Sequence, residues 1–215
     1  MILVTGLGRC GTSVLMKYLK EVKFCIGFNY RWYNIIRAGY ELREATGINV
    51  SLWQKNSKPI NLDDNILDSR GRAFEKTYRE AINQVDDDGF IEVIKDPRLT
   101  WHPDIIETWW AARQDIKLII CHRDIESVMK SRNALPREFA DPKGRTLLQY
   151  KEDFADFFTK VLQLGIPYEI LFFPNFLRNF HSTYEALDRV GLSHDYEVGK
   201  KVWYALVDQT LLKEV

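Results

Sequence analysis

The chain has 215 residues, of which 46% are hydrophobic and 28% are charged, and its 30 basic residues balance its 30 acidic ones. This length favours one domain with a real core, and the composition argues against disordered, collagen-like and coiled-coil chains. A generic nucleic-acid binder usually carries excess positive charge, so we expect no nucleic-acid partner. We predict a single α/β domain that spans residues 1–215.

The three cysteines, Cys10, Cys25 and Cys121, form no paired motif, and an odd number gives no disulfide framework. This usage favours a reducing compartment, and we expect a cytoplasmic location. A strand-like run begins at residue 2 and the apolar runs are short, so we expect neither a leader segment nor a membrane span. With four scattered histidines and no zinc motif, we also expect no metal site.

Four short apolar runs predict buried strands: Ile2–Thr5, Phe90–Ile94, Lys117–Cys121 and Tyr168–Phe172. They are nearly continuous and rich in β-branched or aromatic residues, and helical stretches separate them. This pattern is typical of a parallel sheet covered on both faces. The sequence therefore predicts a P-loop-type three-layer fold, with a central parallel sheet of four to five strands flanked by helices.

Hydrophobic periodicity predicts three helices, at about Thr12–Val22, at residues 71–85 and at residues 146–164, the last of which ends before Gly165. Residues 51–70 lack a clean period and contain turn-forming residues. We interpret them as a less regular excursion over the sheet and a candidate part of an acceptor site.

The segment VTGLGRCGTSVLMKYL, which begins at residue 4, predicts a strand, a glycine-rich turn and a helix. Gly6 and Gly11 have the spacing of a phosphate-binding P-loop, whose backbone N–H groups wrap an anion at the start of a helix. Thr12 and Ser13 follow, where a nucleotide triphosphatase has a lysine before its Ser or Thr. A cation is found instead inside the loop, at Arg9. The alternative is a tight turn in which Thr12 or Ser13 only caps the helix.

The absence of this lysine limits the class of phosphate ligand that the loop is expected to bind. Transfer from a nucleoside triphosphate normally uses that lysine with Mg²⁺ to neutralise the β- and γ-phosphates. A loop that keeps the anion cradle without this lysine suits a phosphate-like group other than an ordinary triphosphate.

A second candidate anion site follows the predicted strand Lys117–Cys121, in the segment IKLIICHRDIESVMKSRNAL. Asp124 can cap a helix in which Ser131 lies about two turns along, so Arg123 and Ser131 can converge as a phosphate clamp. The alternative for Arg123 is a surface ion pair. Ligands of parallel sheets bind beyond the carboxyl ends of the strands, so one ligand could bridge this clamp and the glycine-rich loop.

GRCGTS, followed after another strand by R-x7-S, resembles the cofactor signature of the sulfotransferases. In that family the first loop holds the 5′-phosphosulfate of 3′-phosphoadenosine 5′-phosphosulfate (PAPS), and the later Arg and Ser hold its 3′-phosphate. Further similarity to a bacterial-type branch is found in Gly39–Glu44, Ile94–Trp101 and Tyr168–Ser193. The resemblance implies that the cofactor-binding residues are Gly8, Arg9, Cys10, Gly11, Thr12 and Ser13 in the first element, and Arg123 and Ser131 in the second.

The sequence departs from the family pattern in three places. Cys10 stands where serine is usual, which is tolerable if backbone amides bind the anion. Asp124-Ile125 replaces the frequent Asn/His-Pro, and an Arg-Lys-Gly motif is missing near the C-terminus. Part of the usual contacts to the 3′-phosphate and adenine therefore stays unassigned.

The resemblance implies transfer of a sulfuryl group from PAPS to a hydroxyl or amine of a small-molecule or glycan acceptor, which leaves adenosine 3′,5′-bisphosphate. Cations must screen the charge that moves during this transfer, and Arg9 and Lys95 are the candidates. Two rival readings are a P-loop small-molecule kinase, which would need ATP and Mg²⁺, and an inert binding module that keeps only the anion cradles.

The general base is open between two carboxylates, Glu41 and Asp96, with His102 as a third option. We prefer Glu41 narrowly, because several sulfotransferases have a carboxylate base in the segment after the first helix. The alternative role for Asp96 is to pair with Arg98 or to cap the turn before Pro97. Several aromatic residues are candidates to line an acceptor site: Trp32, Tyr33, Tyr40, Trp53, Trp109 and Trp110.

Overall fold

The structure is a computed structural model, and it describes residues 1–27, 43–54, 62–67, 73–85, 91–133 and 146–207. Its central sheet has five strands in the order β2-β5-β1-β6-β7. Their bounds are Ile26–Gly27 for β2, Val93–Lys95 for β5, Ile2–Thr5 for β1, Lys117–His122 for β6 and Tyr168–Phe172 for β7.

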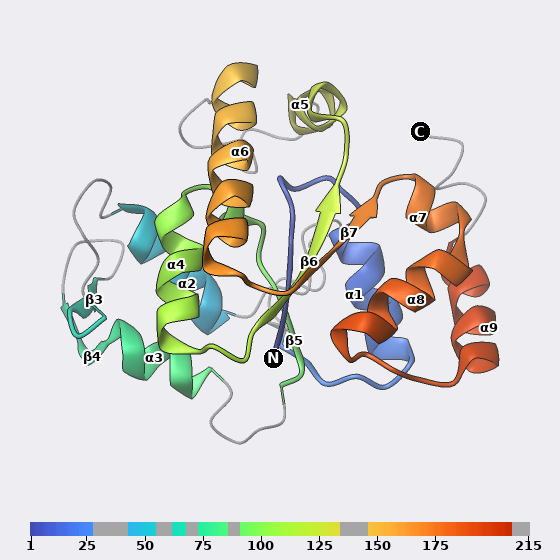
Figure 1. Cartoon of the computed structure of the whole chain (residues 1–215), viewed down its shortest axis with the longest axis horizontal. Helices are drawn as coiled ribbons and strands as arrows, with labels where there is room; N and C mark the ends of the chain where they lie inside the picture. The colour runs from blue at the N-terminus through green and yellow to red at the C-terminus, as the bar shows by residue number, and fades with distance from the viewer. Residues whose placement is uncertain (28–42, 55–61, 68–72, 86–90, 134–145, 208–215) are drawn as a thin grey trace.

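All neighbouring strands of this sheet are parallel. Ile2 of β1 lies opposite Val93 of β5 on one side and opposite Lys117 of β6 on the other. The carboxyl ends of these strands therefore meet at one edge, at the top of Figure 1. The expected α/β fold with a parallel sheet of four to five strands is confirmed.

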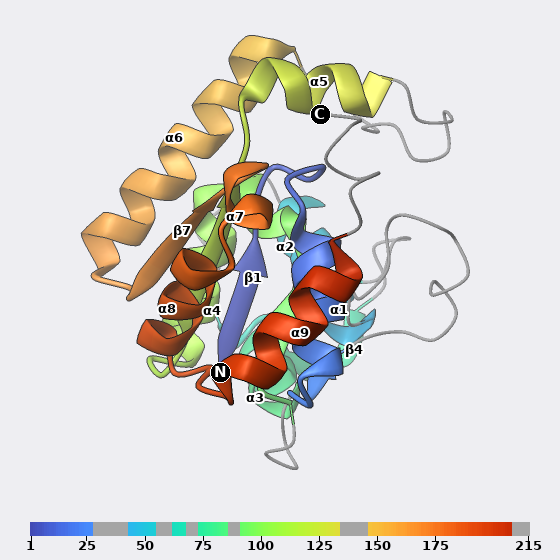
Figure 2. The same cartoon turned by 90° about the vertical axis from the view of Figure 1, so that its right-hand side faces the viewer.

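Helices cover both faces of the sheet (Figures 1 and 2). On one face lie α1 (Thr12–Glu21), α7 (Asn175–Arg178), α8 (Phe180–Val190) and α9 (Tyr196–Leu206), and on the other lie α2 (Arg43–Gln54), α3 (Tyr78–Gln84), α4 (Pro103–Ala112) and α6 (Leu147–Leu164). The helix α5 (Ile125–Asn133) continues from β6 above the carboxyl edge.

The strand residues alternate between two cores. Val4 of β1 packs with Leu15 of α1 and Trp203 of α9, whereas Leu3 packs with Trp109 of α4 and Phe157 of α6. Because successive side chains of a strand point to opposite faces, a continuous apolar run is what a strand buried on both faces requires.

The helices begin and end at residues that explain their bounds. Thr146 accepts a hydrogen bond from the Gln149 N–H and forms a capping box with it, and Gly165 ends α6 in the left-handed conformation. The prediction for 146–164 is therefore confirmed, as is the first helix, although α1 ends at Glu21.

The prediction of one helix over residues 71–85 is wrong in its first half. Ala73–Thr77 forms β4, which pairs antiparallel with β3 (Asn65–Leu67), and α3 begins only at Tyr78. Thr77 accepts from the Glu80 N–H while the Glu80 carboxylate accepts from the Thr77 N–H, so a capping box fixes the helix start there.

The interpretation of residues 51–70 as an irregular excursion needs correction, because parts of its two described stretches, residues 51–54 and 62–67, form regular secondary structure. Residues 51–54 belong to α2, because Ala45, Ile48 and Leu52 recur at helical spacing and are buried against α3 and α4. Residues 65–67 form β3, and residues 55–61 and 68–70 lie outside the described residues.

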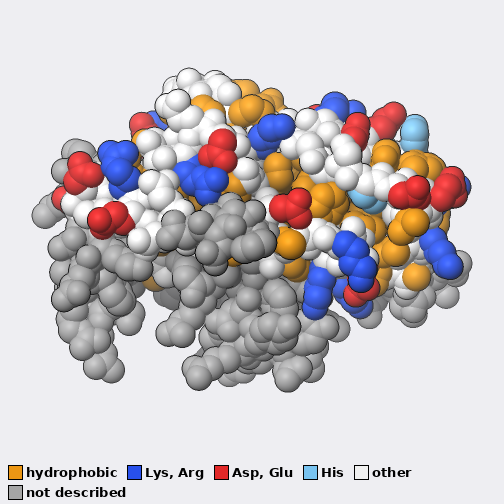
Figure 3. All heavy atoms as spheres, turned by 90° about the horizontal axis from the view of Figure 1, so that it is seen from below, with side chains coloured by type: hydrophobic (Ala, Val, Ile, Leu, Met, Phe, Trp, Pro, Cys, Tyr) orange, Lys and Arg blue, Asp and Glu red, His pale blue; other side chains and the backbone are white. Residues whose placement is uncertain are grey.

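The face at the amino ends of the strands carries basic and acidic side chains interspersed (Figure 3). Ion pairs there include Arg113–Asp115 before β6 at 2.9 Å and Arg189–Glu169 on β7 at 2.6 Å. Within the described ranges, no helix is long and apolar enough to cross a membrane, and no group of three His, Cys, Asp or Glu side chains could hold a metal ion.

Candidate functional site

The glycine-rich loop lies between β1 and α1 at the carboxyl edge of the sheet. Its backbone has positive φ angles at Gly8 (79°), Arg9 (57°) and Gly11 (81°). Positive φ is rare for a residue with a Cβ, so the conformation at Arg9 is strained. Gly8 and Arg9 are thus two consecutive left-handed residues, and they make a tight turn between β1 and α1. Backbone N–H groups in turns of this kind can form anion-binding concavities.

Close contacts fix the loop at its two ends. A Cβ at Gly6 would lie 2.3 Å from the Cys121 carbonyl oxygen, and one at Gly11 would lie 2.6 Å from Phe173 Cδ2. Cys10 is fully buried, with its Sγ 3.0 Å from the Gly8 carbonyl oxygen. Its side chain therefore points into the core, so at this position a ligand in the loop could contact only the backbone.

Gly11 is the N-cap of α1, and Thr12 and Ser13 are its first two helical residues. The alternative in which Thr12 or Ser13 caps the helix is therefore not what the structure has. A glycine cannot cap with a side chain, and the Val14 N–H bonds the Gly11 carbonyl oxygen at 3.1 Å. An anion at this position could accept hydrogen bonds from the N–H groups of Thr12 and Ser13, at the positive end of the helix.

The two predicted anion sites meet at Arg9. Its Nε donates a hydrogen bond to the Ser131 Oγ of α5 at 3.0 Å, and Nη1 of Arg123 donates to the Arg9 carbonyl oxygen at 3.3 Å. These residues are far apart in sequence, and β6 followed by α5 brings them to the loop. All three side chains are half-buried.

Arg123 is held from a second side by an aromatic ring, because its Cζ lies 5.0 Å from the centre of the Phe173 ring. Asp124 caps α5 as expected: its Oδ2 accepts from the Ser127 N–H at 2.8 Å. This hydrogen bond lowers the pKa of Asp124 below its ordinary value. The segment from Arg123 to Ser131 therefore begins with a capped helix start.

Lys95 reaches the same loop from β5. Its side chain is 3% exposed, and its Nζ donates to the Ser13 Oγ at 3.3 Å. The first two positions of α1 thus have a cation beside them that comes from a strand of the sheet.

Cys121 lies beneath the loop. Burial raises the pKa of its thiol well above the ordinary value, so Cys121 is a neutral packing residue.

Asp96 follows Lys95 and is 1% exposed. Its Oδ1 accepts from the backbone N–H and the Nη1 of Arg98, both at 2.8 Å, and its Oδ2 accepts from Asn49 Nδ2 at 3.1 Å. Asp96 is also the N-cap of the short 3-10 helix η2 (Pro97–Thr100). Both alternative roles expected from the sequence, pairing with Arg98 and capping the turn, are present.

A buried hydrogen-bond chain supports Asp96. The Asn49 Oδ1 accepts from Trp109 Nε1 at 2.6 Å, so Asn49 of α2 links Asp96 to α4. An indole nitrogen only donates and an ionised carboxylate only accepts, so one orientation of the Asn49 amide satisfies both partners. Sequence reasoning missed Asn49 because it missed α2, and an isolated Asn in a helical segment gave no signal.

The remaining candidates divide into described and undescribed residues. His102 is the N-cap of α4, with its Nδ1 3.3 Å from the Asp104 N–H. Trp109 is buried in the core, and Trp110 is half-buried. Glu41 and the aromatic residues Trp32, Tyr33 and Tyr40 lie outside the described residues, as does the side chain of Trp53.

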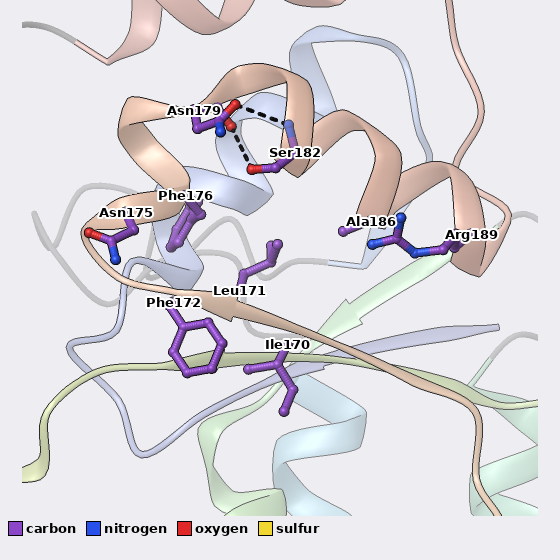
Figure 4. A pocket seen from close by; sticks show the side chains of 9 residues that line it. All are labelled: Ile170, Leu171, Phe172, Asn175, Phe176, Asn179, Ser182, Ala186 and Arg189. Atoms are coloured by element: carbon purple, nitrogen blue, oxygen red, sulfur yellow. Dashed lines mark hydrogen bonds between the residues drawn. The ribbon is translucent and has the colours of Figure 1, made fainter.

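A separate pocket of about 310 Å³ lies beside the edge strand β7 (Figure 4). Phe176 lines it and also lies 2.8 Å from where a Cβ of Gly11 would be, so this ring separates the pocket from the loop. Arg189 at its far end is paired with Glu169. The other lining residues are Ile170, Leu171, Phe172, Asn175, Asn179, Ser182 and Ala186.

Comparisons with known proteins find no match in sequence and a distant likeness in structure. No family model matches the chain, and no curated protein matches it in sequence. A solved structure, the sulfotransferase STF9 from Mycobacterium avium, is 13% identical, with a TM-score of 0.45 over 99% of this chain and 67% of the other. We therefore base the proposed function on the residues of this chain.

Proposed function

We propose that the protein is a PAPS-dependent sulfotransferase that acts on a hydroxyl or amine of a small-molecule or glycan acceptor. The observation that supports this most is the contact between the two anion sites. The Arg9 Nε lies 3.0 Å from the Ser131 Oγ, and Arg123 donates to the Arg9 carbonyl oxygen. A ligand with two anionic groups, such as PAPS, matches two sites that adjoin.

The glycine-rich loop suits the 5′ end of such a ligand. The backbone of this tight turn and the start of α1 can offer N–H donors to an anion without contributing negative charge. The lysine that a triphosphate requires is missing from the sequence after Gly11, which favours a phosphosulfate over ATP.

Lys95 is our candidate for screening the transferring group. PAPS, when bound, would supply the sulfuryl group, and transfer of that group would leave negative charge on the 5′-phosphate. A cation that is 3% exposed and lies at the first turn of α1 acts in a medium where charges interact more strongly than in water. Lys95 needs no rearrangement to reach the loop, because it is already bonded to Ser13.

The hydrogen bonds of Asp96 argue against it as the proposed base, whereas Glu41 lies outside the described residues. The two Asp96 oxygens accept three hydrogen bonds, one of them from a guanidinium. Hydrogen bonds to the charged form hold a carboxylate ionised and weaken it as a proton acceptor. We therefore assign Asp96 a supporting role next to Lys95 and keep Glu41 as the base to be tested.

Thermal unfolding in the presence of candidate donors tests the proposal. PAPS at a hundred times its dissociation constant should raise the free energy of unfolding by ~2.7 kcal/mol, whereas ATP with Mg²⁺ at the same concentration should have a much smaller effect. Stabilisation by ATP and Mg²⁺ in place of PAPS would favour the kinase. Stabilisation by PAPS with no product formed across acceptor classes would favour the inert module.

A further inference from the structure

The side chain of Arg9 reaches α5. The resemblance assigns Arg9 to the loop that holds the 5′-phosphosulfate, yet its Nε donates to the Ser131 Oγ at 3.0 Å. Ser131 is the residue that the resemblance assigns to the 3′-phosphate. The cation at the first turn is Lys95, which lies 3.3 Å from the Ser13 Oγ. Arg9 thus contacts the residue assigned to the 3′-phosphate, whereas Lys95 contacts the start of α1.

The hydrogen bond from Arg9 determines what Ser131 can do. A hydroxyl has one hydrogen to donate and two lone pairs with which to accept. When a lone pair of the Ser131 oxygen accepts from Arg9 Nε, its O–H points elsewhere and can donate to an anion. The Nη groups of Arg9 lie next to this Nε in the same plane, so an anion at the Ser131 hydroxyl is also adjacent to the Arg9 charge.

Arg123 completes this cluster. Its Nη1 bonds the Arg9 carbonyl oxygen at 3.3 Å, and its guanidinium lies 5.0 Å from the Phe173 ring centre. One bond to the loop leaves the other N–H groups of a five-donor fork for a ligand. The acidic neighbour Asp124 accepts from the Ser127 N–H, at the start of α5.

We propose that Arg9 determines specificity for the 3′-phosphate of the donor nucleotide, together with Ser131 and Arg123, in addition to any part it has in transfer. This inference rests on the proposed function, because only a nucleotide with both a 3′- and a 5′-phosphate would engage the cluster and the loop at once. The strained φ of 57° at Arg9 fits this role, since strain in a backbone persists where the surrounding structure holds a side chain in place.

Binding of adenosine 3′,5′-bisphosphate and of AMP tests the inference, because the two ligands differ only in the 3′-phosphate. Arg9→Ala should weaken binding of the bisphosphate by ~10- to 150-fold, the range for a charge-assisted hydrogen bond. AMP affinity should change by no more than about threefold, which also reports that the loop is intact. Arg9→Lys should restore only part of the loss, since it keeps the charge and loses the fork.

Two further variants sharpen the test. Lys17→Ala removes an exposed cation from α1 and should leave the ratio of the two affinities unchanged. Ser131→Ala in combination with Arg9→Ala should weaken bisphosphate binding by less than the product of the two single effects, because the two residues share one network.

The outcomes separate the inference from the function on which it rests. If the wild type binds the bisphosphate and AMP equally, the proposed function fails and this inference with it. If the wild type prefers the bisphosphate but Arg9→Ala weakens both ligands by the same factor, Arg9 serves the 5′ end, and only the inference is overturned.

Discussion

Replacing Asp96 with Asn is expected to destabilise the fold through a defined mismatch of donors. The Asn side chain keeps one oxygen, which can still accept from Arg98. Its NH₂ then faces Asn49 Nδ2, which is also a donor. Asn49 cannot turn its amide over, because its Oδ1 accepts from Trp109 Nε1 at 2.6 Å and an indole nitrogen cannot accept.

The magnitude follows from what is lost. A hydrogen bond to a charged group contributes about 1.5–3 kcal/mol, and a buried donor left unsatisfied costs about 1–3 kcal/mol. Arg98 keeps a neutral acceptor and its side chain is 20% exposed, which limits the loss on its side. We expect Asp96→Asn to lower the free energy of unfolding by about 2–4 kcal/mol.

Urea unfolding measures this loss. Asp115→Asn is the matched control, since Asp115 also pairs with an arginine but its side chain is 55% exposed, and the change should cost less than about 1 kcal/mol. A variant Asp96→Asn as stable as the wild type, but without turnover, would refute the supporting role and make Asp96 the base.

Three further predictions concern the loop, the sheet edge and acid stability. Gly6→Ala should lower the free energy of unfolding in urea by about 1–3 kcal/mol or more, because its Cβ would lie 2.3 Å from the Cys121 carbonyl oxygen. Gly47→Ala, at an open helical site, should instead raise it by about 0.5–1 kcal/mol. Equal effects of the two substitutions would contradict this packing. Lys95→Met should reduce PAPS turnover by about 10²–10³-fold with nucleotide binding largely kept, and unchanged turnover would remove Lys95 from the mechanism. Burial lowers the pKa of His122 from its ordinary value of 6.5, so the contribution of the neutral imidazole to stability is full above pH 6.5 and is lost as the pH falls through the folded-state pKa. The His122→Phe variant should therefore lose less stability than the wild type between about pH 7 and pH 5. Parallel pH profiles of the two proteins would contradict this prediction.

The sequence predicted the core of the sheet because each central strand is buried on both faces and is therefore apolar throughout. It missed β2, Ile26–Gly27, since two residues carry no periodicity. It misassigned Ala73–Thr77 because Phe74 and Tyr78 lie at helical spacing although the helix begins only after Thr77. There, the Thr77 and Glu80 capping box was the local signal that decided the boundary.

The candidate site also has a part that was predictable from the sequence and a part that was not. The glycine-rich loop and Arg123 were predictable, because short motifs encode backbone shape and the end of a strand. The Arg9–Ser131 contact and the Asn49–Asp96 hydrogen bond join elements that are distant in the chain, and only packing brings them together. Side-chain direction at Arg9 also depends on a left-handed backbone that its residue type does not predict.

Calorimetric titration of the wild type with four ligands tests the proposed donor most directly. We expect PAPS to bind at least about a hundredfold tighter than adenosine 5′-phosphosulfate, and adenosine 3′,5′-bisphosphate tighter than AMP by a similar factor, since a clamp with two partners contributes more than one charge-assisted hydrogen bond. Arg123→Ala should remove most of both preferences while leaving AMP binding nearly unchanged. Equal affinities of the wild type for the bisphosphate and AMP would contradict the assignment of Arg123 and Ser131 to a 3′-phosphate, and with it the proposed sulfotransferase.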